Sequence, residues 1–235
     1  MSADPNKPSR KSIDRAGTLL RDWWADRVPL DDSGVDAAFR LVSEYRSSFR
    51  YPLMKVTVTM RGFAERESSE VIVSSRLKRL PTLLDKLGRH PNMKITRMQD
   101  IGGCRAILPG GLKEVAGVLR RIQKNWDVVE VYDYVGSPKP VTGYRATHVV
   151  VRRDGCLIEV QLRTPSQHEW ALQIERTGSR LDLPHLKDGD GPKELVRYFE
   201  LASYFLGIQD TGEAADESLN AEFRQLRGEV LGYFA

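Results

Sequence analysis

Residues 144–163 read YRATHVVVRRDGCLIEVQLR, and this stretch decides the fold. Two β-rich runs flank Asp154-Gly155, which is the strongest short-range signal for a β-hairpin, because a type I′ turn needs positive φ at both central residues. We therefore predict strands over residues 144–152 and 156–163. A two-residue loop between them places His148 opposite Gln161.

Side chains alternate between the two faces of each strand, so this hairpin has one apolar and one polar face. The apolar face is predicted to join the core and carries Val149, Val151, Ile158, Val160 and Leu162. The polar face carries Tyr144, His148, Glu159, Gln161 and Arg163. Because such groups are costly to bury without partners, we expect this face to line a wet cleft. An ordinary polar outer face is the alternative.

The rest of the chain alternates between helical and strand patterns. Helices are predicted over residues 13–25, 35–49, 112–125 and 166–177, and strands over residues 70–75, 103–108 and 128–134. Residues 52–67 contain β-branched residues that leave helix and strand both open, and their length favours a helix. In RLKRLPTLLDKL, residues 76–87, four leucines share one helical face, and Lys78, Thr82 and Lys86 form a separate polar ridge. Strands interleaved with helices predict an α/β fold with a mixed β-sheet of about five strands flanked by helices.

The length of 235 residues suits one domain with additional helices. We expect residues 1–12 to be disordered, 13–69 to form N-terminal helices, 70–178 to form the core and 179–235 to form C-terminal helices. Without a long apolar run or a secretory h-region, the protein is predicted to be cytoplasmic, with no membrane partner. Cys104 and Cys156 lack metal-ligand spacing and are expected to be buried thiols.

The net charge of +4 is distributed unevenly. Residues 76–124 contain 12 Lys or Arg and three acidic residues, whereas residues 213–235 contain five acidic residues and two arginines. The basic segment suits a polyanionic partner such as ATP or RNA. A solvated basic face is the alternative interpretation.

Two carboxylates are candidates for a metal site. Asp100 precedes one predicted strand and Glu159 lies on another, and such hard oxygen ligands suit Mg²⁺ that bridges the phosphates of ATP. Arg76, Lys78 and Lys86 would then form a phosphate clamp through charge-assisted hydrogen bonds.

The loop SPKPVTG, residues 137–143, leads into Tyr144. An ammonium group from Lys139 beside an aromatic ring suits a nucleotide, because the ammonium meets phosphate and the ring stacks on a base. Taken alone, this loop is a weak motif.

Four ordered motifs resemble the RelA/SpoT synthetase domain, the family of the alarmone synthetases. They are RLKRLPTLLDK (76–86), DIGGCR (100–105), DYVGSPKPVTGYRATH (133–148) and IEVQLRT (158–164). The resemblance extends over residues 71–175 and implies a nucleotidyltransferase-like fold. It also implies a pyrophosphokinase that attacks the β-phosphorus of ATP and releases AMP.

The resemblance assigns roles to individual residues. Those that would bind ATP are Arg76 and Arg105 around the adenine, and Lys78, Thr82 and Lys86 at the phosphates. Those that would hold Mg²⁺ and serve catalysis are Asp100 and Glu159, with Glu159 also as general base for the attacking 3′-hydroxyl. Those that would bind the acceptor are Tyr144, stacked on its base, and Lys139, His148, Gln161 and Arg163 around it.

Departures from the family pattern concern the acceptor and the hydrolase. None of the four histidines precedes an Asp, so the His-Asp metal site of the long alarmone enzymes is not expected, and we predict a synthetase without a hydrolase. Alarmone makers typically have Lys-Pro-Asn-Gly-Tyr where this chain has the longer Lys-Pro-Val-Thr-Gly-Tyr, and Ala146-Thr147 replaces the usual Ser-Leu. These features look more like the toxic small alarmone synthetases of toxin–antitoxin and phage-defence systems.

Three hypotheses follow. The favoured one is a toxin that transfers pyrophosphate from ATP to the 3′-CCA end of tRNA, with an antitoxin protein as a possible partner. The second is a small synthetase that makes (p)ppGpp or (p)ppApp from a free purine nucleotide. The third is a non-catalytic nucleotide- or RNA-binding module, against which the presence of both Asp100 and Glu159 argues.

Overall fold

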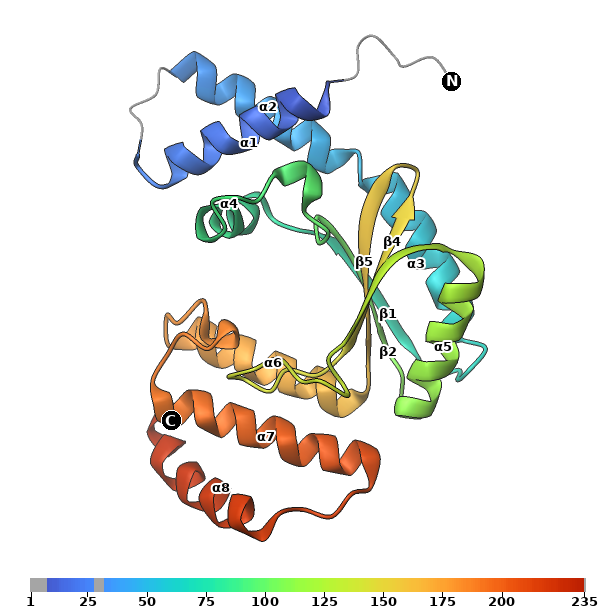
Figure 1. Cartoon of the computed structure of the whole chain (residues 1–235), viewed down its shortest axis with the longest axis vertical. Coiled ribbons are helices and arrows are strands. Elements are labelled where there is room, and N and C mark those ends of the chain that lie inside the picture. Colours follow the sequence, from blue (N-terminus) through green and yellow to red (C-terminus); the bar gives the residue numbers. More distant parts are fainter. Residues whose placement is uncertain (1–7, 28–31, 235) are drawn as a thin grey trace. The chain divides into compact units, whose positions relative to one another are not determined.

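The computed structural model describes residues 8–27 and 32–234 (Figure 1). Its α-helices are α1 (Arg10–Trp24), α2 (Asp32–Ser47), α3 (Arg50–Ala64), α4 (Leu80–Arg89), α5 (Leu112–Asn125), α6 (Pro165–Arg180), α7 (Lys193–Thr211) and α8 (Glu217–Glu229). Three short 3-10 helices are η1 (Ile95–Arg97), η2 (Leu186–Asp188) and η3 (Val230–Tyr233). The strands are β1 (Ile72–Leu77), β2 (Gly102–Ile107), β3 (Asp127–Asp133), β4 (Thr147–Arg153) and β5 (Cys156–Arg163). Every helix in the described ranges is too short or too polar to span a bilayer.

The five strands form one sheet in the order β1-β2-β5-β4-β3. β1 and β2 are antiparallel, because the N–H of Lys78, just after β1, donates to the carbonyl of Ile101, just before β2, at 2.8 Å. β2 and β5 are parallel, because their C-terminal ends meet where the Leu108 N–H donates to the Arg163 carbonyl at 2.9 Å. The prediction of a mixed sheet of about five strands flanked by helices is confirmed.

The predicted hairpin joins β4 and β5. Asp154 and Gly155 form its two-residue loop with φ values of 49° and 80°, as a type I′ turn requires. On β5, Ile158, Val160 and Leu162 are fully buried, so the predicted apolar face is part of the core.

The chain forms two compact units, and the first comprises Met1–Val58, Ser74–Cys104 and Val150–Glu159. In its described part α1 packs against α2, α4 and η1. Phe49 and Ile158 are buried beside the start of β2, where a Cβ at Gly102 would lie 2.8 Å from Ile158 Cδ1. A glycine is therefore needed at this close approach, directly after the Asp100-Ile101 segment.

The second unit comprises Thr59–Val73, Arg105–Val149 and Val160–Ala235. Here α7 packs against both α6 and α8, as Figure 1 shows. Trp170 of α6 lies at the centre of an apolar cluster with residues such as Ile174, Leu195 and Phe199, and its Nε1 donates to the Phe199 carbonyl at 2.8 Å. Burial of large side chains on this scale is the main stabilising contribution to such a helical layer.

The structure corrects several boundaries. β4 begins at Thr147 rather than at residue 144, and Tyr144 instead belongs to the preceding loop, where its carbonyl accepts from the Lys139 N–H at 3.1 Å. α1 begins at Arg10, since the Ser9 hydroxyl caps its first turn, so residues 10–12 are helical; residues 1–7 of the segment predicted to be disordered lie outside the described residues.

A further correction concerns the stretch between β1 and α4. β1 extends to Leu77 and α4 starts at Leu80, with Pro81 in its first turn, so Lys78 is not on the helix of the predicted polar ridge. Cys104 is buried as expected, whereas Cys156 is only half-buried, because it directly follows the hairpin turn.

Candidate functional site

Asp100 is the centre of the first cluster of predicted site residues. It lies between η1 and β2, and its Oδ2 accepts hydrogen bonds from Lys78 Nζ at 3.1 Å and from Lys86 Nζ at 2.8 Å. Lys78 follows β1 and Lys86 belongs to α4, so separate elements bring these charges together. Arg46 of α2 donates from Nε to the Lys78 carbonyl at 2.6 Å and supports the backbone there.

The surroundings of Asp100 keep it ionised. Burial alone would raise its pKa, but Lys86 and Lys78 outweigh burial and hold the pKa below its ordinary value. Its second oxygen, Oδ1, is buried and has no hydrogen-bond partner within residues 8–27 and 32–234. A buried anionic oxygen without a donor is rare in folded proteins and suits a bound cation.

Glu159 is the second predicted carboxylate. It lies half-buried on β5, where it alternates with the buried Ile158 and Val160. β5 is the neighbour of β2, which Asp100 precedes, and both carboxylates belong to the first unit. The two carboxylates that the sequence predicts as metal ligands thus lie just before one strand and on its neighbour.

Arg76 and Thr82 lie beside this cluster in the chain and are both exposed. Arg76 is on β1, and Thr82 is in the first turn of α4. No side chain caps α4 at Arg79, so the N–H groups of its first turn have the orientation that favours an anion.

The second cluster of predicted site residues surrounds Tyr144. Its hydroxyl lies 2.6 Å from His148 Nε2 and accepts a hydrogen bond from Arg163 Nη2 at 2.8 Å. The same Nη2 donates to Gln161 Oε1 at 2.9 Å. His148 and Arg163 are 7% and 6% exposed, so the wet cleft predicted along this face is wrong for these two side chains, because both bond the Tyr144 hydroxyl. Four of the five side chains that the hairpin pattern predicts to share a face are thus linked by hydrogen bonds, and Glu159 is the fifth.

Cations lie over the ring of Tyr144. Lys139 Nζ is 5.3 Å and Arg163 Cζ is 5.3 Å from the ring centroid, distances at which a cation and an aromatic face attract each other. Lys139 Nζ also lies 5.0 Å from the ring centroid of Tyr134. Tyr144 therefore combines a positively charged surrounding with a flat ring, as a nucleotide site requires.

The loop that positions Lys139 closes on itself. The Gly143 N–H donates to the Lys139 carbonyl at 2.9 Å, and the Lys139 N–H donates to the Tyr144 carbonyl at 3.1 Å. These bonds bring Tyr144 back beside the strand face although it is not part of β4. For that reason the predicted contact with His148 is present even though the predicted strand boundary is wrong.

Arg105 and His168 form a group that the sequence analysis did not identify as a unit. Burial lowers the pKa of the His168 imidazole, and the nearby Arg105 and Arg163 lower it further, so this ring is favoured in its neutral form. Its Nδ1 is buried without a hydrogen-bond partner in the described part of the chain. The position of His168 in the first turns of α6, directly after β5, was the available signal. Arg105, assigned to the adenine by resemblance, lies in the second unit with them.

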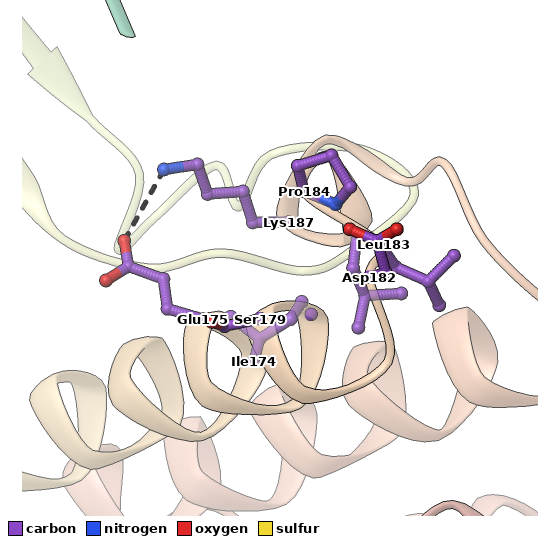
Figure 2. Close-up of a pocket in the computed structure, with 9 residues that line it drawn as sticks. Ile174, Glu175, Ser179, Asp182, Leu183, Pro184 and Lys187 are labelled. Carbon is purple, nitrogen blue, oxygen red and sulfur yellow. Dashed lines mark hydrogen bonds and ion pairs between the residues drawn. The ribbon is translucent and has the colours of Figure 1, made fainter. Parts of the chain in front are cut away.

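Two hollows of the described surface lie away from the predicted residues. Figure 2 shows one of about 260 Å³ beside α6, with an exposed ion pair between Lys187 Nζ and Glu175 Oε1 at 3.4 Å. Another of about 800 Å³ is lined by residues of α1 and α2. Neither is lined by a predicted site residue. Around Tyr144 and Asp100 the polar side chains instead contact one another.

Comparisons with known proteins bear on this geometry. Residues 75–177 match a family model described as a region found in RelA / SpoT proteins. Two curated relatives, uncharacterized proteins of Mycobacterium bovis and Mycobacterium tuberculosis, are each 36% identical over 104 residues. The match covers 44% of this chain and 38% of each relative, so it spans well under half of their length.

Solved structures share the fold. Small alarmone synthetase 1 from Bacillus subtilis, bound to its product pppGpp, has a TM-score of 0.63 and 23% identity, covering 80% of this chain and 97% of that one. Small alarmone synthetase 2 from the same organism has a TM-score of 0.62 and 21% identity, covering 72% and 94%. A GTP pyrophosphokinase family protein from Streptococcus pneumoniae has a TM-score of 0.60 and 22% identity, covering 77% and 96%.

These structures agree with the family match on the arrangement of the sheet and its helices. The segment that matches the region found in RelA / SpoT proteins, residues 75–177, contains both clusters.

Proposed function

We propose that the chain is an ATP-dependent pyrophosphokinase that transfers the β,γ-pyrophosphate of ATP to a 3′-hydroxyl and releases AMP. The arrangement at Asp100 carries this proposal: two lysine ammonium groups bond one oxygen, and the other oxygen is buried without a donor among the described residues. Phosphate oxygens can replace the carboxylate as partners of the two lysines. The family match supports the same reaction.

The residues fit Mg²⁺ as the cofactor. Asp100 Oδ1 and the Glu159 carboxylate would hold the ion, which commonly takes one or two protein carboxylates and completes its shell with water and substrate phosphates. When bound, it neutralises charge on the transferred phosphates. A larger cluster is not required, and within the described ranges no group of three or more His, Cys, Asp or Glu could hold a metal.

The chain's own residues divide the remaining tasks on the donor side. Lys78 and Lys86 bind the phosphates together with Thr82, and Arg76 and Arg105 bind the adenine. The acceptor 3′-oxygen attacks the β-phosphorus, the bond to the oxygen bridging the α- and β-phosphates breaks, and AMP leaves with that oxygen. Glu159 accepts the proton of the 3′-hydroxyl, for which it must come within hydrogen-bond distance. Positioning and charge neutralisation dominate such a transfer.

Tyr144 stacks on the acceptor base, while Lys139, His148, Gln161 and Arg163 surround its sugar and phosphates. We favour the 3′-CCA end of tRNA as acceptor, because the loop before Tyr144 is longer than the Lys-Pro-Asn-Gly-Tyr form and its Val141 takes a positive φ of 75°. The enzyme would then inhibit translation in the cytoplasm as a toxin, without hydrolase activity, and an antitoxin protein would neutralise it. A free purine nucleotide is the alternative acceptor.

A labelling assay tests the proposal. The protein is incubated with γ-labelled ATP and Mg²⁺, together with unfractionated tRNA, GDP, GTP or no further acceptor. We expect label on tRNA, and none on tRNA whose terminal ribose has been oxidised by periodate, because that treatment destroys the 3′-hydroxyl. Label on free nucleotides alone would instead identify a small alarmone synthetase. The absence of label in every reaction would indicate a non-catalytic binding module.

A further inference from the structure

One face of α7 contacts both chain segments that carry the Tyr144 cluster. Ser203, Gly207 and Asp210 follow each other at spacings of four and three residues, so they share this face. None of the three belongs to the predicted site. Each contacts a segment directly next to a residue of the cluster.

Ser203 and the backbone of α7 hold the segment before Tyr144. The Ser203 hydroxyl donates to the Gly143 carbonyl. Gly143 has a φ of 71°, and a Cβ at this position would lie 3.2 Å from the Glu200 carbonyl oxygen. The acceptor loop thus approaches the helix backbone so closely that only glycine is free of strain there.

Gly207 makes room for Arg145, the residue after Tyr144. A Cβ at Gly207 would lie 2.8 Å from Arg145 Cζ, so the guanidinium passes directly over this glycine. Arg145 Nη1 donates to the Val135 carbonyl at 3.0 Å, which ties the strand-to-loop segment to the same place. Gly207 precedes Asp210 by three residues on the same face of α7, so the guanidinium lies over the helix turn that carries Asp210. Burial lowers the pKa of Arg145, and the carboxylates of Asp210 and Glu213 oppose that change.

Asp210 also accepts hydrogen bonds from the start of α6. Its carboxylate accepts from Thr164 Oγ1 at 2.8 Å, from Ser166 Oγ at 2.6 Å and from Gln167 Nε2 at 3.3 Å. Thr164 is fully buried, directly follows Arg163 and already forms a capping box with Gln167. Asp210 is therefore not needed to cap α6, and its three further bonds fix where the β5–α6 junction lies.

We propose that Asp210 is a positioning residue of the acceptor site, which holds Tyr144 and Arg163 in register through Arg145 on one side and Thr164 on the other. The proposal rests on the acceptor role given above to these two residues. Asp210 acts through these neighbours of Tyr144 and Arg163, and therefore on the use of the acceptor rather than on the use of ATP.

The test is the kinetics of Asp210→Ala with tRNA and, in parallel, with GTP as acceptor. A displacement of the order of 1 Å costs about 100-fold in rate, so we expect kcat/KM for the acceptor to fall about 10- to 100-fold, mainly through KM, and the KM for ATP to stay within about twofold. Asp210→Asn, which keeps one acceptor oxygen for the hydroxyl groups, should give an intermediate value.

Glu222→Gln is the matched control. Glu222 of α8 also accepts two hydrogen bonds from another helix, from Arg197 Nε at 2.7 Å and Nη2 at 2.8 Å. Within residues 8–27 and 32–234 it forms no hydrogen bond to a segment of the Tyr144 cluster. Glu222→Gln should leave the KM for ATP and the KM for the acceptor unchanged. If Asp210→Ala raises the KM values for ATP and acceptor equally, or changes neither, the positioning role is wrong.

Two further measurements keep the proposal testable if Asp210→Ala folds poorly or if the chain transfers nothing. Gly207→Ala favours the helix but crowds Arg145, so it should fold and still raise the acceptor KM. NMR signals of ¹³C-labelled tyrosine should shift for Tyr144 in Asp210→Ala and not in Glu222→Gln. An inactive wild-type protein would overturn the proposed function alone, whereas unshifted Tyr144 signals would overturn the role of Asp210.

Discussion

The region around Asp100 and the region around Tyr144 are held together by different interactions. In the first, two ammonium groups share one oxygen of a carboxylate, and the residues come from three separate elements of the first unit. In the second, a phenol, an imidazole, an amide and a guanidinium of the second unit bond one another. The first region is built from ionic contacts, and the second from shape and directed hydrogen bonds.

This difference matches the two halves of the proposed reaction. A triphosphate with its cation is recognised by charge, and lysines can exchange a carboxylate partner for a phosphate partner without a change of fold. A base and a sugar are recognised by stacking and by the directions of hydrogen bonds, which need a rigid surrounding. The two regions should therefore respond differently to substitution.

The largest effect is expected from Asp100→Ala. Loss of this carboxylate removes one of the two metal ligands and should lower kcat by about 1000-fold or more, because metal coordination contributes several kcal/mol to such a transfer. Glu159→Ala should do the same, and both variants should remain folded by circular dichroism.

Asp85→Ala is the control for that experiment. Asp85 lies on α4 like Lys86, but pairs with Arg89 at 3.3 Å on the exposed side of the helix, where such a pair contributes about 0.5 kcal/mol or less. Equal loss of activity in Asp85→Ala and Asp100→Ala would show that the region acts as a scaffold rather than as a metal and phosphate site.

A smaller effect is expected from Tyr144→Ala. Loss of base stacking should weaken use of the acceptor by about 1–3 kcal/mol, or about 10- to 150-fold, in steady-state assays with saturating ATP. Tyr144→Phe retains the ring and should lose less, because only the bonds to His148 and Arg163 disappear. Tyr51→Ala, an exposed tyrosine on α3, should have no effect. A uniform change in the KM for ATP would contradict the division between the two regions.

The third prediction concerns pH and stability. Asp100 has a pKa below its ordinary value of 3.8 in the folded chain, so its contribution is complete above that value and is lost as the pH falls through the lower folded pKa. Thermal unfolding should show Asp100→Asn to be less stable than wild type by about 1–3 kcal/mol at neutral pH, with the same difference at about pH 5. The difference should shrink only below about pH 4. A difference that already shrinks between pH 7 and pH 5 would contradict the pairing with Lys78 and Lys86.

The smallest effect on activity is expected from chemical labelling of the cysteines, because they lie outside both clusters. Burial raises the pKa of Cys104 to about 11, with Thr57 opposing this, so iodoacetamide at about pH 8 should leave Cys104 unmodified and label the half-buried Cys156. Peptide mass spectrometry gives the site of labelling, and unfolding in urea should expose both thiols. Rapid labelling of the folded chain at Cys104 would mean that β2 is not packed as described.

Short-range sequence patterns account for much of the region around Tyr144. The Asp154-Gly155 turn and the alternation of side chains along β4 and β5 are enough to place His148, Gln161 and Arg163 on one face, because a two-residue loop sets the register of a hairpin. The prediction that Tyr144 lies beside His148 is confirmed, but its predicted position on a strand is wrong, because the closed loop brings Tyr144 to His148.

The contacts in the region around Asp100 depend on tertiary structure. Lys78, Lys86 and Asp100 are separated by up to 22 positions, and no local periodicity relates them across a strand end, a helix and a loop. The sequence indicated a basic segment with a carboxylate, but not that both lysines would bond the same oxygen. Packing of separate elements decides such contacts. The prediction that Lys78 lies on the helical ridge was therefore wrong, although Lys78 and Asp100 were both predicted as site residues.

The same difference between local pattern and tertiary packing explains why the sequence did not indicate Asp210. Asp210 lies 44 and 46 positions from Ser166 and Thr164, and an aspartate near the end of a helix carries no sign of its partners. Sequence alone was sufficient for the family resemblance, the sheet class and the hairpin face, because these follow from short-range patterns. Three features arise only where distant residues meet in the folded chain: the lowered pKa of Asp100, the burial of Arg163, and the contacts of α7 with the segments beside Tyr144 and Arg163.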